Sequence, residues 1–507
     1  MKRATLALPV LIVVLILMLA LTGGSPTRAQ SSPVWNSAIL YFNPADTPIE
    51  TQGCESAPEC DDISILYYRE SGETVPSKAI PIRPFESGVV LIGSVLYDQT
   101  FKGSAVISST VPLAALFRQV YTSSDPYSPI VYTSLDNTMA GEGYFYLPWV
   151  QSTSGFDTEV GVQNIESVPV SLKLHFYKRD GSLYTYDPPQ GISLEPQRSY
   201  IFRISSIPLP WANSFDGSLV VEAHFSGMPD SHPKIVAAAR EVMVGGNKAN
   251  GFEGVGTGQT AWHMVTSLCS YGPALQTSQY SIQNTSLATT AQVQVDYYTA
   301  NGELYATYPA SGSATISPGA ALLVNGCDPT PKTAGAVMTG KYLSAVVRST
   351  NSVGLAVVGK VIGKDGLLTA FNGQTPPPSS PDGKYYVAMP YVEFAVREDG
   401  IRTYLSVLNV GENPANNIQL TYYGRDGSLI TAVNLTAKPL PAHAKIGSDP
   451  SAAGAIDPGA YGFIGAANII SDQPVVALGR VQRGVSLPGG ITNLGDDYIG
   501  AYYLKNW

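Results

Sequence analysis

Apolar and polar side chains alternate along many short stretches of this chain, and this alternation predicts β-strands. Leu172, Leu174 and Phe176 alternate with Lys173 and His175, which is the period of a strand with one buried face. Several such stretches run into Asp-Gly or Asn-Gly pairs, which are strong hairpin signals because both turn residues adopt positive φ. No long window carries helical periodicity. The pattern therefore predicts an all-β chain of antiparallel strands.

The same order of elements recurs four times along the chain. An apolar run first ends at an asparagine: Asn43, Asn164, Asn284 and Asn409. An alternating strand then enters a tight turn with a glycine: Gly72, Gly181, Gly302 and Gly427. A strand led by a proline follows: Pro84, Pro196, Pro318 and Pro441. A run of small apolar residues finally ends at a base: Arg118, Arg240, Lys360 and Arg480.

The spacing of these markers indicates domains rather than solenoid turns. The asparagines lie roughly 120 residues apart, whereas solenoid repeats span roughly 20 to 50 residues. Roughly seven short strands per repeat, separated by turn residues, are typical of an antiparallel β-sandwich. The sequence predicts four tandem sandwiches with nearly even lengths: 31–150, 151–268, 269–392 and 393–507. Three segments are interpreted as linkers: 122–137, the Gly-rich 245–259 and the Pro-rich spacer 375–383.

The C-terminal segment 498–507 is an apolar, aromatic strand that resembles 142–150, 383–392 and, more weakly, 260–268. If this recurring strand ends each sandwich, the domain lengths are even, and 498–507 is predicted to close the fourth sandwich. If it begins each sandwich, the terminal strand has no domain of its own. It would then pair with repeat 1 of another molecule by strand addition and build a filament.

Residues 162–202 carry the run "VQNIESVPVSLKLHFYKRDGSLY…ISLEPQRSYIF". This run resembles the tandem immunoglobulin-like modules of bacterial cell-surface and secreted proteins, including adhesion-related domains. The resemblance covers 31–507 as a pattern of strands and turns, and only repeat 3 keeps a Gly after its Pro, at Gly319. It implies immunoglobulin-like sandwiches that serve as stalks, adhesins or binding modules.

The N-terminus predicts an exported chain. Residues 1–29 combine two early bases, an apolar run and a small-x-small cleavage site, which is the pattern of a secretory signal peptide, with an uncleaved anchor as the alternative. No later segment is long and apolar enough to cross a membrane. The predicted location is therefore secreted or on the extracellular cell surface.

Four cysteines in an exported chain predict disulfides within single repeats, Cys54–Cys60 and Cys269–Cys327. Zinc is the alternative, but the two distant pairs contain no CxxC. Closing the longer loop is expected to stabilise the chain by about 4 kcal/mol in the loop-entropy model.

Composition adds exclusions but no reaction. The net charge of −9 argues against nucleic acid, because phosphate binding needs basic patches. Five scattered histidines form no metal motif: His175, His224, His232, His263 and His443. The adjacent acids are interpreted as solvated loop charge: Asp61-Asp62, Glu398-Asp399 and Asp496-Asp497. We find no HExxH or GxSxG motif, and we expect no catalytic, cofactor-binding or metal-binding residues.

These observations favour a non-enzymatic, exported structural or adhesive surface protein. The alternative is a module that binds glycan or protein in support of a surface enzyme or polysaccharide system. Thirty tyrosines supply stacking platforms for that alternative, although many sit in paired positions just before the turns, where one ring is expected to face inward. The repeated base is the most prominent candidate for a functional column, and a structural role at a strand end or domain junction is the favoured interpretation.

Overall fold

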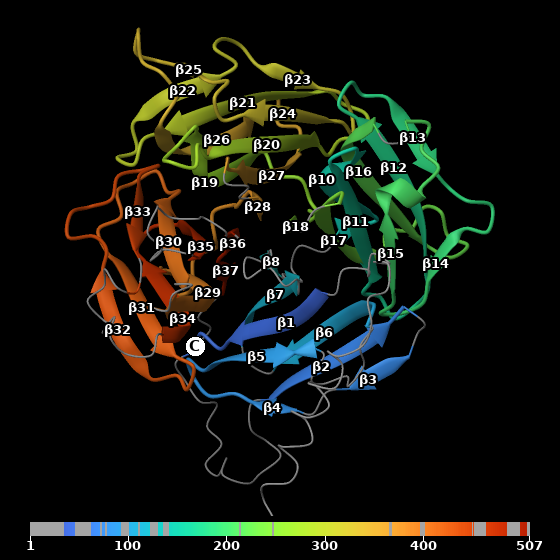
Figure 1. The fold of residues 1–507 in the computed structure, drawn as a ribbon, viewed down its shortest axis with the longest axis horizontal. Helices are drawn as coiled ribbons and strands as arrows, with labels where there is room; N and C mark the ends of the chain where they lie inside the picture. Colours follow the sequence, from blue (N-terminus) through green and yellow to red (C-terminus); the bar gives the residue numbers. More distant parts are fainter. Residues whose placement is uncertain are drawn as a thin grey trace, which may run out of the picture. The chain divides into compact units, whose positions relative to one another are not determined.

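Strands make up nearly all of the regular structure in the described residues, which confirms the predicted all-β class. The computed structural model describes these ranges: 35–45, 62–70, 73–76, 79–92, 101–109, 112–121, 130–134, 141–211, 214–245, 248–364, 368–395, 401–448, 450, 463–483 and 497–503. The described residues also include a 3₁₀ turn, η2 (Ile204–Ser206). All the strand pairs are antiparallel, and the same pairing scheme recurs in each of the four sequence repeats (Figure 1).

Each repeat contains an inner sheet of four strands. The Asn-terminated strands are β1 (Trp35–Phe42), β11 (Phe156–Asn164), β20 (Thr277–Asn284) and β30 (Ile401–Asn409). On one side each pairs with a Pro-led strand: β5 (Ser87–Leu91), β15 (Ser199–Arg203), β24 (Ala321–Asn325) and β33 (Lys445–Ser448). On the other side each pairs with the strand that holds the repeated base: β7 (Ala114–Tyr121), β17 (Lys234–Met243), β27 (Leu355–Ile362) and β35 (Val475–Arg483). The last strands of the inner sheets are β8 (Ile130–Ser134), β18 (Ala249–Glu253), β28 (Leu368–Asn372) and β36 (Asp497–Ile499).

The outer sheet of each repeat is built around the strand that carries the paired aromatics. These strands are β2 (Asp62–Arg69), β12 (Val170–Lys178), β21 (Ala291–Tyr298) and β31 (Ile418–Gly424). Each forms the predicted hairpin with β3 (Thr74–Pro76), β13 (Leu183–Tyr186), β22 (Leu304–Tyr308) or β32 (Leu429–Asn434). Each also pairs with β6 (Gly103–Ser109), β16 (Ser214–Phe225), β26 (Lys341–Ser349) or β34 (Phe463–Ser471). Short strands complete the sheets: β4 (Ile80–Pro81), β9 (Gly141–Glu142), β14 (Ile192–Leu194), β23 (Ala314–Ile316), β25 (Thr330–Pro331) and β37 (Ala501–Tyr502).

The recurring apolar strand opens a repeat, in contrast to the phasing expected from even domain lengths. It forms β10 (Tyr144–Thr153), β19 (Ala261–Cys269) and β29 (Tyr385–Ala395). β10 pairs with β16, β19 with β26 and β29 with β34, and each partner lies later in the chain. The expected boundaries after residues 150, 268 and 392 therefore cut through three strands. Even domain lengths could not distinguish the two choices of boundary, because shifting every boundary by one strand leaves the lengths almost unchanged.

The C-terminal strands do close repeat 4, as predicted, but they are not counterparts of the opening strands. β36 pairs with β35 on the inner sheet, and β37 pairs with β29 of the same repeat. Tyr498-Ile499-Gly500 thus occupies the position of Phe252-Glu253-Gly254 in repeat 2 and Phe371-Asn372-Gly373 in repeat 3. Tyr498 is buried, so this part of the terminus is apolar because it belongs to a core. Residues 504–507 lie outside the described part.

Two of the three predicted linkers contain an inner strand. The Gly-rich segment 245–259 includes β18, all five residues of which are buried. Likewise, segment 122–137 includes β8. Glycine is needed here because the backbone passes close to aromatic rings: a side chain on Gly254 would lie 2.4 Å from the Phe145 ring. Crowding, rather than flexibility, therefore accounts for Gly254.

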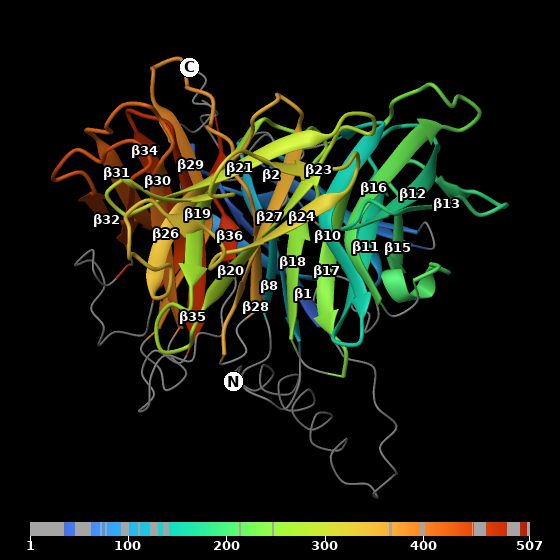
Figure 2. The same ribbon diagram turned by 90° about the horizontal axis from the view of Figure 1, so that it is seen from above.

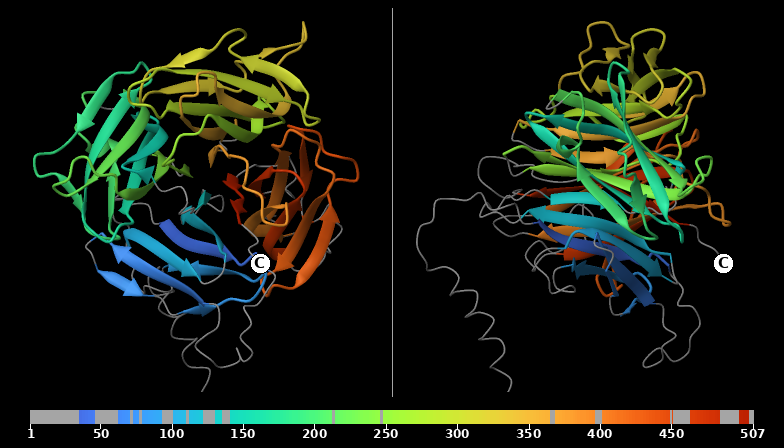
Figure 3. Two further views of the ribbon diagram at one scale, coloured as in Figure 1. Left: turned by 180° about the vertical axis from the view of Figure 1, so that it is seen from behind. Right: turned by 90° about the vertical axis from the view of Figure 1, so that its right-hand side faces the viewer.

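Residues 35–507 form a single compact unit in which the repeats contact one another in cyclic order (Figure 1). β8 contacts β18, β18 contacts β28, β28 contacts β36, and β36 contacts β8. Seen from above, β10 stands next to β27 and β18 next to β28 (Figure 2). The same cyclic order is seen from behind (Figure 3). The unit is thus a closed ring, not a string of separate modules.

Hydrophobic clusters cross three of the four junctions of the ring. One cluster joins Tyr146 and Val220 of repeat 2 to repeat 3 and extends to Leu408 and Leu478 of repeat 4. Another joins Leu40 of repeat 1 to the core of repeat 4. Burial of apolar surface is worth about 25 cal/mol per Å², so shared clusters hold neighbouring repeats together. Among the described residues, no cluster contains side chains from both repeat 1 and repeat 2.

Candidate functional site

The repeated residues gather at the junctions between neighbouring repeats, which makes these junctions the candidate functional site. The four asparagines are an exception, since each stabilises its own repeat. All four are buried. Their side-chain Nδ2 groups donate to carbonyls of the Pro-led segment, at 3.1 Å from Asn43, 3.0 Å from Asn164, 3.0 Å from Asn284 and 2.9 Å from Asn409. Their Oδ1 atoms each accept the backbone N–H two residues later. Each asparagine therefore ties the end of an inner strand to the chain segment opposite it.

The turn glycines bring the outer hairpins against the next repeat. Gly181, Gly302 and Gly427 have φ of 89°, 85° and 80°, which a tight hairpin turn needs and which favours glycine. A side chain on Gly302 would lie 2.2 Å from the Ala442 carbonyl oxygen of repeat 4, and one on Gly427 would lie 2.5 Å from that of Pro84 in repeat 1. The last hairpin therefore packs on the first repeat. Gly72 lies outside the described residues.

One ring of each aromatic pair before the turn lies in the core, as the sequence predicted. The first ring of each pair is buried in its own repeat: Tyr67, Phe176, Tyr297 and Tyr422. The second ring faces the next repeat in the two clearest cases. Tyr298 stacks on His443 with 4.4 Å between ring centroids, and Tyr423 stacks on Phe85 at 4.3 Å. These two tyrosines are engaged in packing between repeats.

All four repeated bases contact the repeat that precedes them around the ring. Arg240 Nη1 donates to Gln119 Oε1 of repeat 1 at 3.0 Å, and Arg480 Nη1 donates to Gln276 Oε1 of repeat 3 at 3.3 Å. Lys360 pairs with Glu241 of repeat 2. Arg118 of repeat 1 lies over the Tyr391 ring of repeat 4, 5.5 Å from its centroid. The column that sequence reasoning singled out is thus a set of junction contacts.

Two of these bases pair with buried acids, Glu241 and Asp497, and the sequence did not reveal either pair. Arg480 forms a two-pronged ion pair with Asp497, whose side chain also accepts from Thr369 Oγ1 of repeat 3 at 2.7 Å. Asp497 is 1% exposed, so its interpretation as solvated loop charge was wrong. Pairing with Asp497 raises the pKa of Arg480 although burial opposes it. Asp61, Glu398, Asp399 and Asp496 lie outside the described residues.

Another buried base, Lys445 of repeat 4, could not be singled out from the sequence because it lies in an ordinary Pro-led strand. Its Nζ donates to the carbonyl oxygens of Val265 and Leu343 in repeat 3, at 3.2 and 2.7 Å, and lies over the Tyr342 ring. Burial, reinforced by Arg480, holds the pKa of Lys445 well below its usual value. This side chain anchors repeat 4 in the carbonyl groups of repeat 3.

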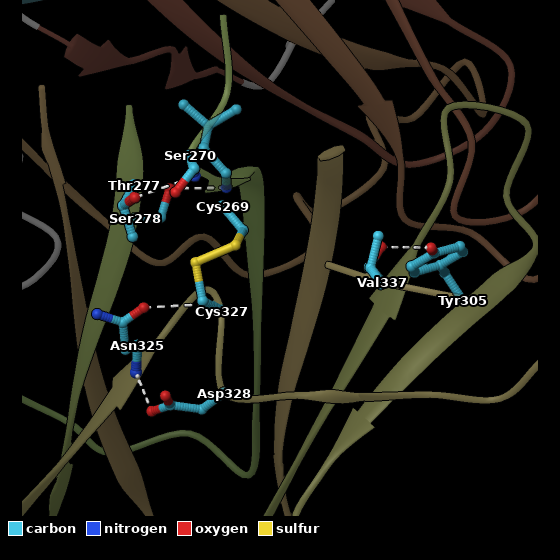
Figure 4. Close-up of a disulfide and its surroundings, with 10 residues drawn as sticks. Cys269, Ser270, Thr277, Ser278, Tyr305, Asn325, Cys327, Asp328 and Val337 are labelled. Carbon is cyan, nitrogen blue, oxygen red and sulfur yellow. Dashed lines mark hydrogen bonds between the residues drawn. A yellow bond between two sulfur atoms is a disulfide. The ribbon is translucent and has the colours of Figure 1, made fainter. Parts of the chain in front are cut away.

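The predicted disulfide Cys269–Cys327 is present (Figure 4). It joins the end of β19 to the turn after β24, where the backbone N–H of Cys327 donates to Asn325 Oδ1 at 2.9 Å. The bridge ties the outer sheet of repeat 3 to its inner sheet. Cys54 and Cys60 lie outside the described residues.

The histidines form no common site. His175 pairs with Glu222 on an outer strand, whereas His263 is buried on β19. Burial, with His443 as the second cause, lowers the pKa of His263 to about 4. In the described part of the chain, no three His, Cys, Asp or Glu side chains are grouped so that they would hold a metal ion. That part also has no helix of the length and apolar character that a membrane span requires.

No known family model and no curated protein matches this chain.

Proposed function

We propose that this chain is a non-enzymatic, exported structural or adhesive component of a cell surface, with immunoglobulin-like repeats assembled into a ring. The observation that carries the proposal is the use of the repeated base. In all four repeats it contacts the preceding repeat, including the contact of Arg118 with Tyr391 that closes the ring. Repeated polar residues that contact neighbouring repeats stabilise the arrangement of the four repeats, which is what a structural protein requires.

The disulfide supports an exported protein, since disulfides persist in oxidising compartments. The closed ring favours a structural role, because a closed ring holds its surface loops at fixed spacing. Loops carried by a rigid scaffold are where binding residues are most often found. The described loops are thus the expected points of attachment to a surface.

Surface labelling of intact cells that produce the chain tests its location, and a deletion strain tests its role. We expect the chain to react with a membrane-impermeant label, and the deletion strain to lose attachment or envelope integrity that the wild-type gene restores. Recovery of the chain only from the cell interior, or turnover of a polymer substrate by the purified chain, would contradict the proposal.

A protein-binding role is the second candidate, and one observation favours it. Leu183, Leu304 and Leu429 occupy the first position of β13, β22 and β32 and are 52%, 44% and 64% exposed. Equivalent exposed leucines on three outer hairpins present a repeated apolar contact to a partner. A triple Leu→Ser variant should fold normally because these side chains are exposed. If its attachment to surfaces equals that of the wild type, this second candidate fails.

A further inference from the structure

The turns at one end of the ring differ in charge from the turns at the other end. We call the end at which β1, β11 and β20 begin the basal end. These strands hold equivalent places in their inner sheets, with equivalent pairing to β7, β17 and β27. Each repeated base contacts the preceding repeat, so the repeats succeed one another by rotation, and their equivalent strand ends lie on one side of the ring.

Large apolar side chains project from the turns at the basal end. In repeat 2, Val244 follows β17, and in repeat 3 the turn 270–276 carries Tyr271 and Leu275, beside Ile362 at the end of β27. All four side chains are between 40% and 56% exposed. The turns of repeat 3 lie against each other, because the backbone N–H of Lys364 donates to the carbonyl oxygen in the middle of the 270–276 turn at 2.7 Å. Two turns therefore present their apolar residues together.

The turn 270–276 is held in an uncommon backbone conformation. Ser270 and Leu275 have φ of 45° and 50°, a region that residues other than glycine rarely adopt. The disulfide of Cys269 anchors the start of the turn, and the backbone N–H of Ser270 donates to Thr277 Oγ1 at 3.1 Å (Figure 4). Such conformations persist only where the surroundings enforce them, and they concentrate at binding sites. A turn fixed in this way presents Leu275 with little further loss of conformational entropy on binding.

Lysines accompany the apolar residues at the basal end. Lys248 lies in the turn that begins with Val244, and the exposed Lys364 lies in the turn that follows Ile362. The described residues of these turns and of 270–276 contain no acid. The nearby carboxylate of Asp328 accepts the backbone N–H of Asn325 at 2.9 Å. In a chain with a net charge of −9, these turns are locally positive.

The turns at the opposite end are apolar but acidic. They follow the asparagines at 165–169, 285–290 and 410–417, and they expose Val168 and Leu287 to 45% and 40%. The same turns contain Glu166 and Glu412 and no base. Anionic headgroups attract lysine and repel carboxylates. Only the basal end therefore combines apolar side chains with the charge that an anionic surface attracts, among the turns that the structure describes.

We propose that the basal end binds the surface of a lipid bilayer that contains anionic lipid. Leu275 and Ile362 enter the boundary between headgroups and acyl chains, and Tyr271 lies at that interface, where tyrosine is enriched. Lys248 and Lys364 reach the headgroup phosphates, since a lysine stem extends along apolar surface while its ammonium stays in water.

The path of the chain supports a bilayer rather than another partner. β1 begins with Trp35 at the basal end, so the chain enters the ring there, after the apolar run 6–21. A retained anchor in that run would hold the basal end, and not the acidic end, against the membrane. The proposal rests on the export proposed above and names the surface to which the ring attaches.

Co-sedimentation with vesicles tests the proposal. Residues 35–507 form one compact unit, so the test uses the mature chain that begins at residue 30, without the apolar run. We expect it to bind vesicles of phosphatidylcholine mixed with phosphatidylglycerol and to bind phosphatidylcholine vesicles much more weakly. Added salt should weaken the binding, because it screens exposed charges. A mature chain that stays in solution with both kinds of vesicle would overturn the proposal.

Matched variants locate the binding surface. The double variant Leu275→Ser, Ile362→Ser should lose about tenfold or more in affinity for the mixed vesicles, because two apolar side chains no longer enter the bilayer. Lys364→Gln should lose about fivefold. The control Val168→Ser, Leu287→Ser removes equally exposed side chains from the acidic end and should bind like the wild type. All five side chains are exposed, so thermal denaturation should show the same fold throughout.

Three results would contradict the assignment of the basal end. Equal losses in the basal and control variants would show that the surface lies elsewhere. Full binding by the basal double variant would show that these residues do not enter the bilayer. Capture of a purified surface protein or glycan that Leu275→Ser, Ile362→Ser abolishes, without binding to vesicles, would show a partner of another class. Each of these leaves surface labelling of intact cells unchanged, whereas recovery of the chain only from the cell interior removes the proposed function itself.

Discussion

The junction between repeats 2 and 3 and the junction between repeats 1 and 2 are built differently. At the former, the opening strand β10 contacts β20 and β27 of the next repeat, and buried apolar side chains cross the boundary. At the latter, the described residues show polar contacts: Lys102 Nζ with the Ile201 carbonyl oxygen at 3.3 Å, and Arg240 with Gln119 at 3.0 Å. Repeats of similar sequence pattern therefore meet through unequal interfaces. We expect the ring to open first between repeats 1 and 2.

The largest effect is expected from removing the aromatic ring at the strong junction. Trp149→Ala deletes a buried ring that packs in the repeat 2 core and against Lys360. Truncation of a buried aromatic residue costs about 3 to 5 kcal/mol. Chemical denaturation should show this loss, and hydrogen exchange should rise in β27 and β28 as well as in repeat 2. Unchanged exchange in repeat 3 would show that the two repeats are not coupled through Trp149.

Removal of the disulfide should weaken repeat 3 within the strongly coupled part of the ring. Cys327→Ser leaves Cys269 buried and frees a loop that the bridge closes. The expected loss is about 4 kcal/mol, because the unfolded chain gains conformational freedom. Denaturation with and without reductant measures it. The reductant should have no further effect on repeat 3 in the variant, and local exchange in repeat 1 should stay at the wild-type rate.

Acid should loosen the same side of the ring before it affects repeat 1. His263 has a pKa of about 4 when folded against an ordinary value of 6.5, so the unfolded chain binds the proton first as the pH falls. Stability is complete above pH 6.5 and is lost between about 6.5 and 4, by about 3 kcal/mol.

His263→Gln should remove this part of the pH dependence. His175→Gln is the matched control, because His175 already pairs with Glu222 and is less buried. Denaturation midpoints at pH 7 and pH 4.5 give the answer. If both variants keep the wild-type slope, His263 does not stay neutral in the folded chain.

The smallest effect is expected at the weak junction. Lys102 is largely exposed and also pairs with Glu70, so Lys102→Ala should cost less than about 1 kcal/mol of global stability. Exchange in β6 and β15, which contact each other, should nevertheless rise. A global loss as large as that of Trp149→Ala would show that this junction is as strong as its neighbour.

The sequence by itself determined the strands, the hairpins, the four-fold repeat and the Cys269–Cys327 bridge. These features have local causes. Alternation determines which face of a strand is buried, an Asp-Gly pair favours a tight turn, and a pair of cysteines in an exported chain favours a disulfide. The domain boundaries could not be predicted, because β10 pairs with β16 across roughly 60 to 80 residues. The order of strands along the chain is the same whether the recurring strand ends one repeat or begins the next.

Only the tertiary structure decided that the repeats close into a ring and that Lys360 and Glu241 meet. Burial of a charge costs free energy unless an ion pair or hydrogen bonds offset it, and the partner group can come from any repeat. Asp497 was interpreted as loop charge because its partners Arg480 and Thr369, which lie 17 and 128 residues away along the chain, contact it only in the folded structure. Ion pairs and hydrogen bonds between residues distant in sequence leave no periodic pattern along the chain, so only the tertiary structure reveals them.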